Sequence, residues 1–294
     1  MKKIILASAM LVAFTAASVS SADETSKENK TITTKGGVTF IPNKGTTPPT
    51  DPENPGEGVK PGPEVNPPGT TGPLSIDFAS SLNFGTNLIT SKTETYVARA
   101  QGIMEEGTPE NGAGKPSRYV PNYVQITDNR GSNSGWTLKV KQNGQFTNKE
   151  TLNKVLKGST VTFANPTLNS TMIKTVKSPD AVQGFTLDAG LDENTPGAET
   201  LVMSAQNEAG AGTWLDYFGK DLKEVETIIE DAEAPAEPQT IKETVNPAIT
   251  LTVPGTTPKD AVKYTTSFTW TLSDIPGTGI VEQDEKEKPA TPEV

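Results

Sequence analysis

Apolar and polar residues alternate in several short segments between residues 74 and 276. The clearest segments run from Ile76 to Phe78, Trp136 to Val140, Val161 to Phe163, Ile249 to Val253 and Phe268 to Leu272. A period of two places the apolar side chains on one face of an extended strand and the threonines or other polar side chains on the opposite face. Turn-forming residues such as Asn143 and Gly144 separate the segments. The pattern predicts half-buried strands of antiparallel sheet.

One segment, Lys149 to Leu156, has a helical pattern instead. Leu152, Val155 and Leu156 follow the i, i+3, i+4 spacing, and Gly158 lies near the expected end of the helix. Many short strands with one short helix predict an all-β fold, a single β-sandwich- or barrel-like domain that we assign to residues 74–281. The stretch that begins at Leu222 has no decisive period, so it is either a short helix or a strand.

The N-terminal and C-terminal segments of the chain differ in residue composition from the predicted domain. Lys2 and Lys3 precede an apolar stretch that ends in the small residues Ser20, Ser21 and Ala22, which predicts a secretory signal peptide over residues 1–22. Residues 282–294 are charged and contain proline, which predicts a disordered tail. No apolar run beyond the signal peptide reaches the ~18 residues of a membrane helix, so we expect no membrane span in the mature chain.

A proline- and glycine-rich region separates the signal peptide from the domain. Residues 23–41 are mostly polar. Between Pro42 and Pro73 there are ten prolines and six glycines, with Val59 and Val65 as the only larger aliphatic residues. Such a composition buries too little apolar surface to offset the entropy of ordering. We therefore expect residues 23–73 to be a disordered linker that acts as a semi-rigid spacer.

The composition and charge of the chain limit the catalytic groups, metal ligands and binding partners that it can have. The chain has no cysteine and no histidine, which excludes disulfides, catalytic thiolates and imidazoles, and the most frequent metal ligand. The formal net charge of −10 becomes −12 without Lys2 and Lys3, and it repels nucleic-acid phosphates and anionic wall polymers. We expect no cofactor, no metal ion and no nucleic-acid partner.

Two W-x-L tripeptides carry a resemblance to a known family. They are Trp136-Thr137-Leu138 and Trp270-Thr271-Leu272. The chain resembles the WxL-domain surface proteins of low-GC Gram-positive bacteria from about Pro73 to Pro276. The other matching segments, in order, are Gly72 to Asp77, Asn83 to Gly85, Tyr123 to Gly131, Gly212 to Trp214, Tyr217 to Gly219 and Tyr264 to Pro276. An acidic, proline-containing segment from Asp221 to about Glu243 departs from the family pattern.

The resemblance implies a secreted cell-surface protein whose domain associates non-covalently with the wall, through peptidoglycan or another wall glycan. Assemblies of such proteins are linked to adhesion. Members are typically made with membrane-anchored envelope proteins. An alternative is therefore a structural subunit of a surface complex, whose domain mainly binds such a partner protein. No L-P-x-T-G motif is present, so we expect no sortase-catalysed covalent attachment.

The tryptophans are the first candidates for a binding site. In each W-x-L the Trp and Leu share one strand face, so Trp136, Leu138, Trp270 and Leu272 either contact a ligand or pack in the core, and burial favours the core. Trp214 is followed by Leu215 and breaks the alternation. With Tyr217 and Phe218 it is either a glycan platform or part of a second apolar cluster.

Carboxylates are the only groups that could support glycan hydrolysis, which needs two of them flanking the bond. Asp77, Asp128 and Asp274 lie near predicted strand ends, where turn capping is the ordinary role. A cation site near Asp128 and Asn129 would lack the calcium-loop spacing. We therefore expect no catalytic residue and no enzyme.

Overall fold

The computed structural model describes residues 30–64, 66–104, 115–190, 192, 194–228 and 240–279. The chain divides into two units, Met1–Phe40 and Ile41–Val294. In the first unit, residues 30–40 are exposed and form neither helix nor strand. The predicted signal peptide (1–22) and tail (282–294) lie outside the described residues, so both stay predictions.

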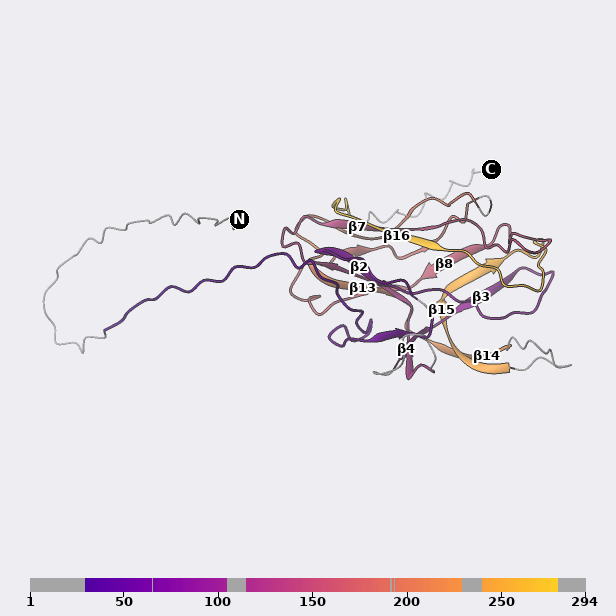
Figure 1. Ribbon diagram of the computed structural model, residues 1–294, viewed down its shortest axis with the longest axis horizontal. Coiled ribbons are helices and arrows are strands. Elements are labelled where there is room, and N and C mark those ends of the chain that lie inside the picture. Colours follow the sequence, from indigo (N-terminus) through magenta and orange to yellow (C-terminus); the bar gives the residue numbers. More distant parts are fainter. Residues whose placement is uncertain are drawn as a thin grey trace, which may run out of the picture. The chain divides into compact units, whose positions relative to one another are not determined.

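The described part of the second unit is built from strands and turns, without a helix (Figure 1). The strands are β1 (Lys60–Gly62), β2 (Leu74–Ala79), β3 (Glu94–Arg99), β4 (Gln101–Met104), β5 (Arg118–Val120), β6 (Tyr123–Asp128), β7 (Trp136–Gln142), β8 (Thr160–Ala164), β9 (Pro166–Asn169), β10 (Asp180–Ala181), β11 (Gly184–Thr186), β12 (Thr200–Ala205), β13 (Gly212–Phe218), β14 (Lys223–Ile228), β15 (Thr240–Val253) and β16 (Phe268–Ser273). Among these residues, nothing forms a helix long and apolar enough to cross a membrane.

The strands form four small antiparallel sheets. The small sheet has the order β1-β4-β5, the W-x-L sheet β10-β12-β7-β16, and the central sheet β2-β6-β13-β9. The fourth has the order β11-β8-β15-β14, with β3 also paired to β15. The all-β class is confirmed. The expected sandwich or barrel is not confirmed, because the strands divide among four small sheets in a propeller-like way.

The main hydrophobic core is shared by three of these sheets. The central sheet contributes Val124, Ile126, Trp214 and Phe218, the W-x-L sheet contributes Trp136, Leu138, Val140 and Met203, and the fourth sheet contributes Val161, Phe163, Ile249 and Leu251. A smaller cluster lies on the other face of the central sheet, against the small sheet, and contains Phe78, Ile103, Val120, Tyr123, Leu215 and Tyr217. The central sheet is therefore covered on both faces.

The predicted alternating strands are confirmed where one face is buried. In β7, Trp136, Leu138 and Val140 are buried, while Thr137 and Lys139 between them are partly exposed. The neighbouring β16 pairs with β7 in antiparallel register, with Trp270 opposite Val140. The two W-x-L tripeptides are thus adjacent strands of one sheet. The undecided stretch after Leu222 contains the strand β14.

The predicted helix over Lys149 to Leu156 is wrong. This segment forms turns and a bridge between Thr147 and Val155, and Leu152 is 90% exposed. The carboxylate of Asp260, far along the chain, accepts hydrogen bonds from the Thr151 hydroxyl and from the backbone and side-chain N–H groups of Asn153. Asp260 therefore satisfies hydrogen-bond donors of this loop in a non-helical conformation. The spacing of apolar residues within the loop gives no sign of this distant partner.

The expected disordered linker is also corrected. Residues 46–64 and 66–70, which we call the proline strap, lie on the domain. Lys60–Gly62 forms β1 and pairs with β4, and a bridge joins Thr50 to Gly58. Asp51 is buried and forms an ion pair of 2.6 Å with Arg118. The composition still explains why the strap has no core of its own, because its order comes from contacts with the sheets beneath it.

Candidate functional site

Trp136 is a core residue in this fold. Its side chain is fully buried, and its indole Nε1–H donates a 3.0 Å hydrogen bond to the carbonyl oxygen of Gly210. Leu138, the last residue of the same tripeptide, is also fully buried. A ligand on the surface therefore cannot stack on Trp136 without opening the core.

The second tripeptide is more accessible, because β16 is the terminal strand of its sheet. Trp270 and Leu272 pack partly against the main core, while Thr269 and Thr271 on the opposite face are exposed. The two motifs thus differ in burial although their sequences are alike. In both motifs the Trp and Leu side chains pack in or against the main core, which supports a packing role for the motif.

Trp214, Tyr217 and Phe218 do not form a surface platform. All three are buried, and Trp214 donates its indole N–H to the carbonyl oxygen of Ala211 over 3.0 Å. Successive side chains of β13 point to opposite faces, so Trp214 and Phe218 enter the main core while Tyr217 enters the smaller cluster. The break in alternation that Leu215 introduces reflects a strand buried on both sides.

The carboxylates at strand ends have different surroundings. Both oxygens of Asp128 accept hydrogen bonds from the Arg130 guanidinium, at 2.9 and 2.7 Å, and Oδ1 also accepts from the Arg130 backbone N–H. This is the expected turn role, and it occupies the carboxylate that a cation site would need. Asp274 is exposed. The described residues contain no group of three acidic side chains placed to hold a metal ion.

Asp77 differs from the capping role expected of it. A β-bulge between Ile76 and Phe78 interrupts the register with β6. The Asp77 carboxylate is buried, and it accepts hydrogen bonds from the hydroxyls of Ser75 and Thr127, each at 2.6 Å, and from the Gln125 amide at 2.9 Å. Burial raises the pKa of Asp77, and these three hydrogen bonds oppose the rise.

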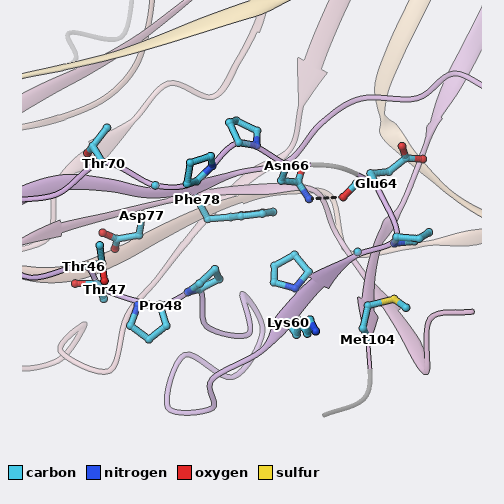
Figure 2. A pocket seen from close by; sticks show the side chains of 17 residues that line it. Thr46, Thr47, Pro48, Lys60, Glu64, Asn66, Thr70, Asp77, Phe78 and Met104 are labelled. Carbon is cyan, nitrogen blue, oxygen red and sulfur yellow. Dashed lines mark hydrogen bonds between the residues drawn. The ribbon is translucent and has the colours of Figure 1, made fainter. Parts of the chain in front are cut away.

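A cavity of about 450 Å³ lies between the proline strap and this part of the domain, lined by both (Figure 2). In the view of Figure 2, Asp77, Thr46 and Thr47 mark one end of the cavity, and Met104 marks the other. The volume is within the range of small-molecule sites. The cavity combines a buried carboxylate with hydroxyl, amide and proline side chains, so it is equipped to bind a small polar ligand.

The strap is anchored beside this cavity through Gln125. The Gln125 side-chain oxygen accepts hydrogen bonds from the backbone N–H of Thr50, at 2.8 Å, and from its hydroxyl, at 3.1 Å. Its amide nitrogen donates to the carbonyl oxygen of Pro48 at 3.0 Å and to Asp77. One buried side chain therefore connects the strap to the carboxylate that lines the cavity.

A second cavity of about 470 Å³ lies beside β3, β14 and β15. Tyr96, Leu88 and Phe84 line it together with the ion pair between Arg99 and Glu243, whose closest atoms are 2.6 Å apart. Leu88 and the adjacent Ile89 are strongly exposed for aliphatic side chains. This site is apolar with an acidic rim and holds no buried unpaired carboxylate.

One buried carboxylate lies outside both cavities. Asp216 shares the face of β13 that Trp214 and Phe218 present to the main core, and neither of its oxygens accepts a hydrogen bond of normal geometry within the described part of the chain. Burial raises its pKa to about 8, offset only in part by the backbone N–H of Thr167. Asp216 therefore influences the stability of the fold and its dependence on pH, and its burial keeps it from contacting a ligand.

Sequence reasoning did not identify the cavity beneath the strap. The sequence assigned Asp77 to turn capping, and Gln125 lies in a segment that was noted only for its family resemblance, so neither was predicted as a ligand contact. The one available signal was the dense clustering of proline directly before the domain. Composition alone assigned that clustering to a spacer.

Comparison with known proteins gives a clear family match. A family model described as "WxL domain surface cell wall-binding" matches residues 27–276. No curated protein and no solved structure matches the chain. The matched range includes the proline strap as well as all four sheets.

Proposed function

Because the chain belongs to the WxL-domain family of surface cell wall-binding proteins, we propose that it is a secreted, non-enzymatic protein held non-covalently on the Gram-positive wall. The ligand would be peptidoglycan or another wall glycan, and adhesion would follow from display at the surface. The observation that carries this proposal is the family match, which spans residues 27–276.

The chemistry of the described residues supports binding over catalysis. Glycan hydrolysis needs one protonated and one ionised carboxyl flanking the bond. Asp77 has three hydrogen-bond donors around it, and Asp128 is paired with Arg130. Glu64, the other acidic residue that lines the cavity of Asp77, accepts a hydrogen bond of 3.0 Å from the Asn83 amide. A non-covalent ligand site needs only shape and hydrogen bonds, which the strap cavity offers.

A second candidate is a structural subunit whose domain mainly binds a membrane-anchored partner protein. The second cavity favours it, because Leu88 and Ile89 are 67% and 56% exposed beside it. Exposed aliphatic groups next to a groove are typical of protein contacts. Under this reading, wall association would be secondary and would need the partner.

Purified sacculi free of protein partners test the two candidates. The mature protein should sediment with sacculi and be released intact by a concentrated chaotrope, because non-covalent contacts are weakened by it. Retention through boiling detergent and chaotrope, with release only by a wall hydrolase, would contradict non-covalent attachment. Sedimentation that depends on added membrane-anchored partner would favour the second candidate.

A further inference from the structure

We propose that the cavity beneath the proline strap binds an uncharged, hydroxyl-rich sugar unit, with Asp77 as the hydrogen-bond acceptor that positions it. This inference rests on the proposed wall association and names the site and the ligand class within it. It also assigns a role to the strap, which forms one wall of the site.

The first support is the way Asp77 is held. The residue is 4% exposed, lines the cavity, and is fixed by Ser75 on Oδ1 and by Thr127 and Gln125 on Oδ2. Each carboxylate oxygen can accept two hydrogen bonds. Oδ1 accepts only one of the bonds found here, so it retains capacity for a donor from a ligand. A hydroxyl group supplies such a donor without bringing a charge into a desolvated place.

The second support is the large share of proline in the lining, which also contains the side-chain donors Lys60 and Asn66. Six of the seventeen lining residues are prolines: Pro48, Pro49, Pro61, Pro63, Pro67 and Pro68. Proline has a carbonyl acceptor and no backbone N–H. Their rings also provide apolar C–H surface, against which the C–H face of a sugar ring can pack. A lining rich in acceptors matches a ligand that carries many hydroxyl and amide donors.

Charge and size agree with this ligand class. Asp77, Glu64 and Lys60 line the cavity, so the acidic side chains outnumber the basic one, and the whole chain has a net charge of −10. Both features disfavour phosphate-bearing wall polymers. A volume of about 450 Å³ is in the lower part of the range for small-molecule sites, enough for a short saccharide and too small for a folded partner. An uncharged glycan unit therefore fits better than an anionic polymer.

The test uses the mature full chain and two probes, N-acetylglucosamine oligosaccharides and intact sacculi. Thr46 lies on the cavity and has an exposed side chain, so T46W should fill the site while the fold is kept. Thr256, exposed in a turn away from this cavity, provides the matched control T256W. D77N keeps the shape of the carboxylate and removes its charge.

Calorimetry should show oligosaccharide binding by the wild type and by T256W, loss of binding in T46W with unchanged thermal unfolding, and about tenfold weaker binding in D77N. Wild-type affinity for the oligosaccharide in T46W would overturn the assignment of the site. Loss of sacculus binding in T46W, with no oligosaccharide binding by the wild type, would overturn the sugar and point to the wall peptide. Sacculus binding retained by T46W overturns the site alone, whereas a wild type that does not bind sacculi overturns the proposed function itself.

Discussion

Replacing the tryptophans of the two W-x-L motifs by alanine should have unequal effects on stability. Trp136 is fully buried in the main core, and Trp270 is only partly buried on a terminal strand. If the motif acts through packing, the free energy of unfolding should fall much more in W136A than in W270A. If the motif binds the wall directly, the two variants should lose binding and keep their stability.

The expected magnitudes follow from burial. A buried Trp removes about 150–250 Å² from water, which at about 25 cal/mol per Å² corresponds to about 4–6 kcal/mol as an upper bound. Truncations of buried aromatics cost about 3–5 kcal/mol. W136A also leaves the Gly210 carbonyl without its indole donor, so we expect about 4–5 kcal/mol. Because part of Trp270 is already in water, W270A should cost about 2 kcal/mol.

On the same purified variants, urea unfolding measures the free energy of unfolding and sacculus sedimentation measures wall binding. W136F, which keeps most of the apolar volume, should recover part of the stability and part of the binding. W214A is a further control, since Trp214 is equally buried on another sheet. Unchanged unfolding with abolished sacculus binding in W136A would refute the packing role and move the ligand contact onto the motif.

Three further predictions concern the surroundings of this core and the strap. G210A should destabilise the protein by about 2–4 kcal/mol, because Gly210 has φ +72° and an added Cβ would lie 2.7 Å from the Trp136 Nε1; thermal unfolding within the wild-type range would count against this. The pKa of Asp216 is about 8 in the folded state, against an ordinary aspartate pKa of 3.8. The folded protein therefore binds the extra proton, and stability should fall as the pH rises from about 4 to 8. D216N should flatten this dependence in urea unfolding at several pH values, with a remaining slope from Asp77, whose pKa is also raised; an identical slope would contradict the assignment. Deleting residues 46–70 should cost about 3 kcal/mol, because the buried side chain of Gln125 loses its three hydrogen bonds to Thr50 and Pro48. A deletion variant with wild-type melting would restore the spacer interpretation.

The sequence alone identified the strands, because strand periodicity is local. Trp136 to Val140 and Ile249 to Val253 show the apolar alternation of a half-buried strand, and both are strands in the structure. The same reasoning failed at Lys149 to Leu156, where three leucine and valine positions satisfied a helical spacing. There the hydrogen bonds to Asp260, more than a hundred residues away, decided the conformation.

The hydrophobic pattern of the sequence likewise could not show that a strand is buried on both faces. β13 carries Trp214 into one core and Tyr217 into another, and a strand that is covered twice has no polar face to reveal it. The sequence left Trp214, Tyr217 and Phe218 open as either a glycan platform or part of a second apolar cluster, because Leu215 breaks the alternation. Only the packing of the small sheet on the central sheet excluded that platform.

The cavity beneath the strap could be identified only from the tertiary structure. Local composition correctly indicated that residues 42–73 have no apolar core of their own, and the W-x-L motifs correctly indicated the family. Neither could show that Thr50 and Pro48 would find Gln125, or that Asp51 would meet Arg118. Those contacts join residues 67 or more positions apart, and their free energy comes from burial in a surface that exists only after the sheets have formed. The sequence thus determined which segments become strands, while the folded domain determined that the proline-rich segment becomes one wall of a cavity.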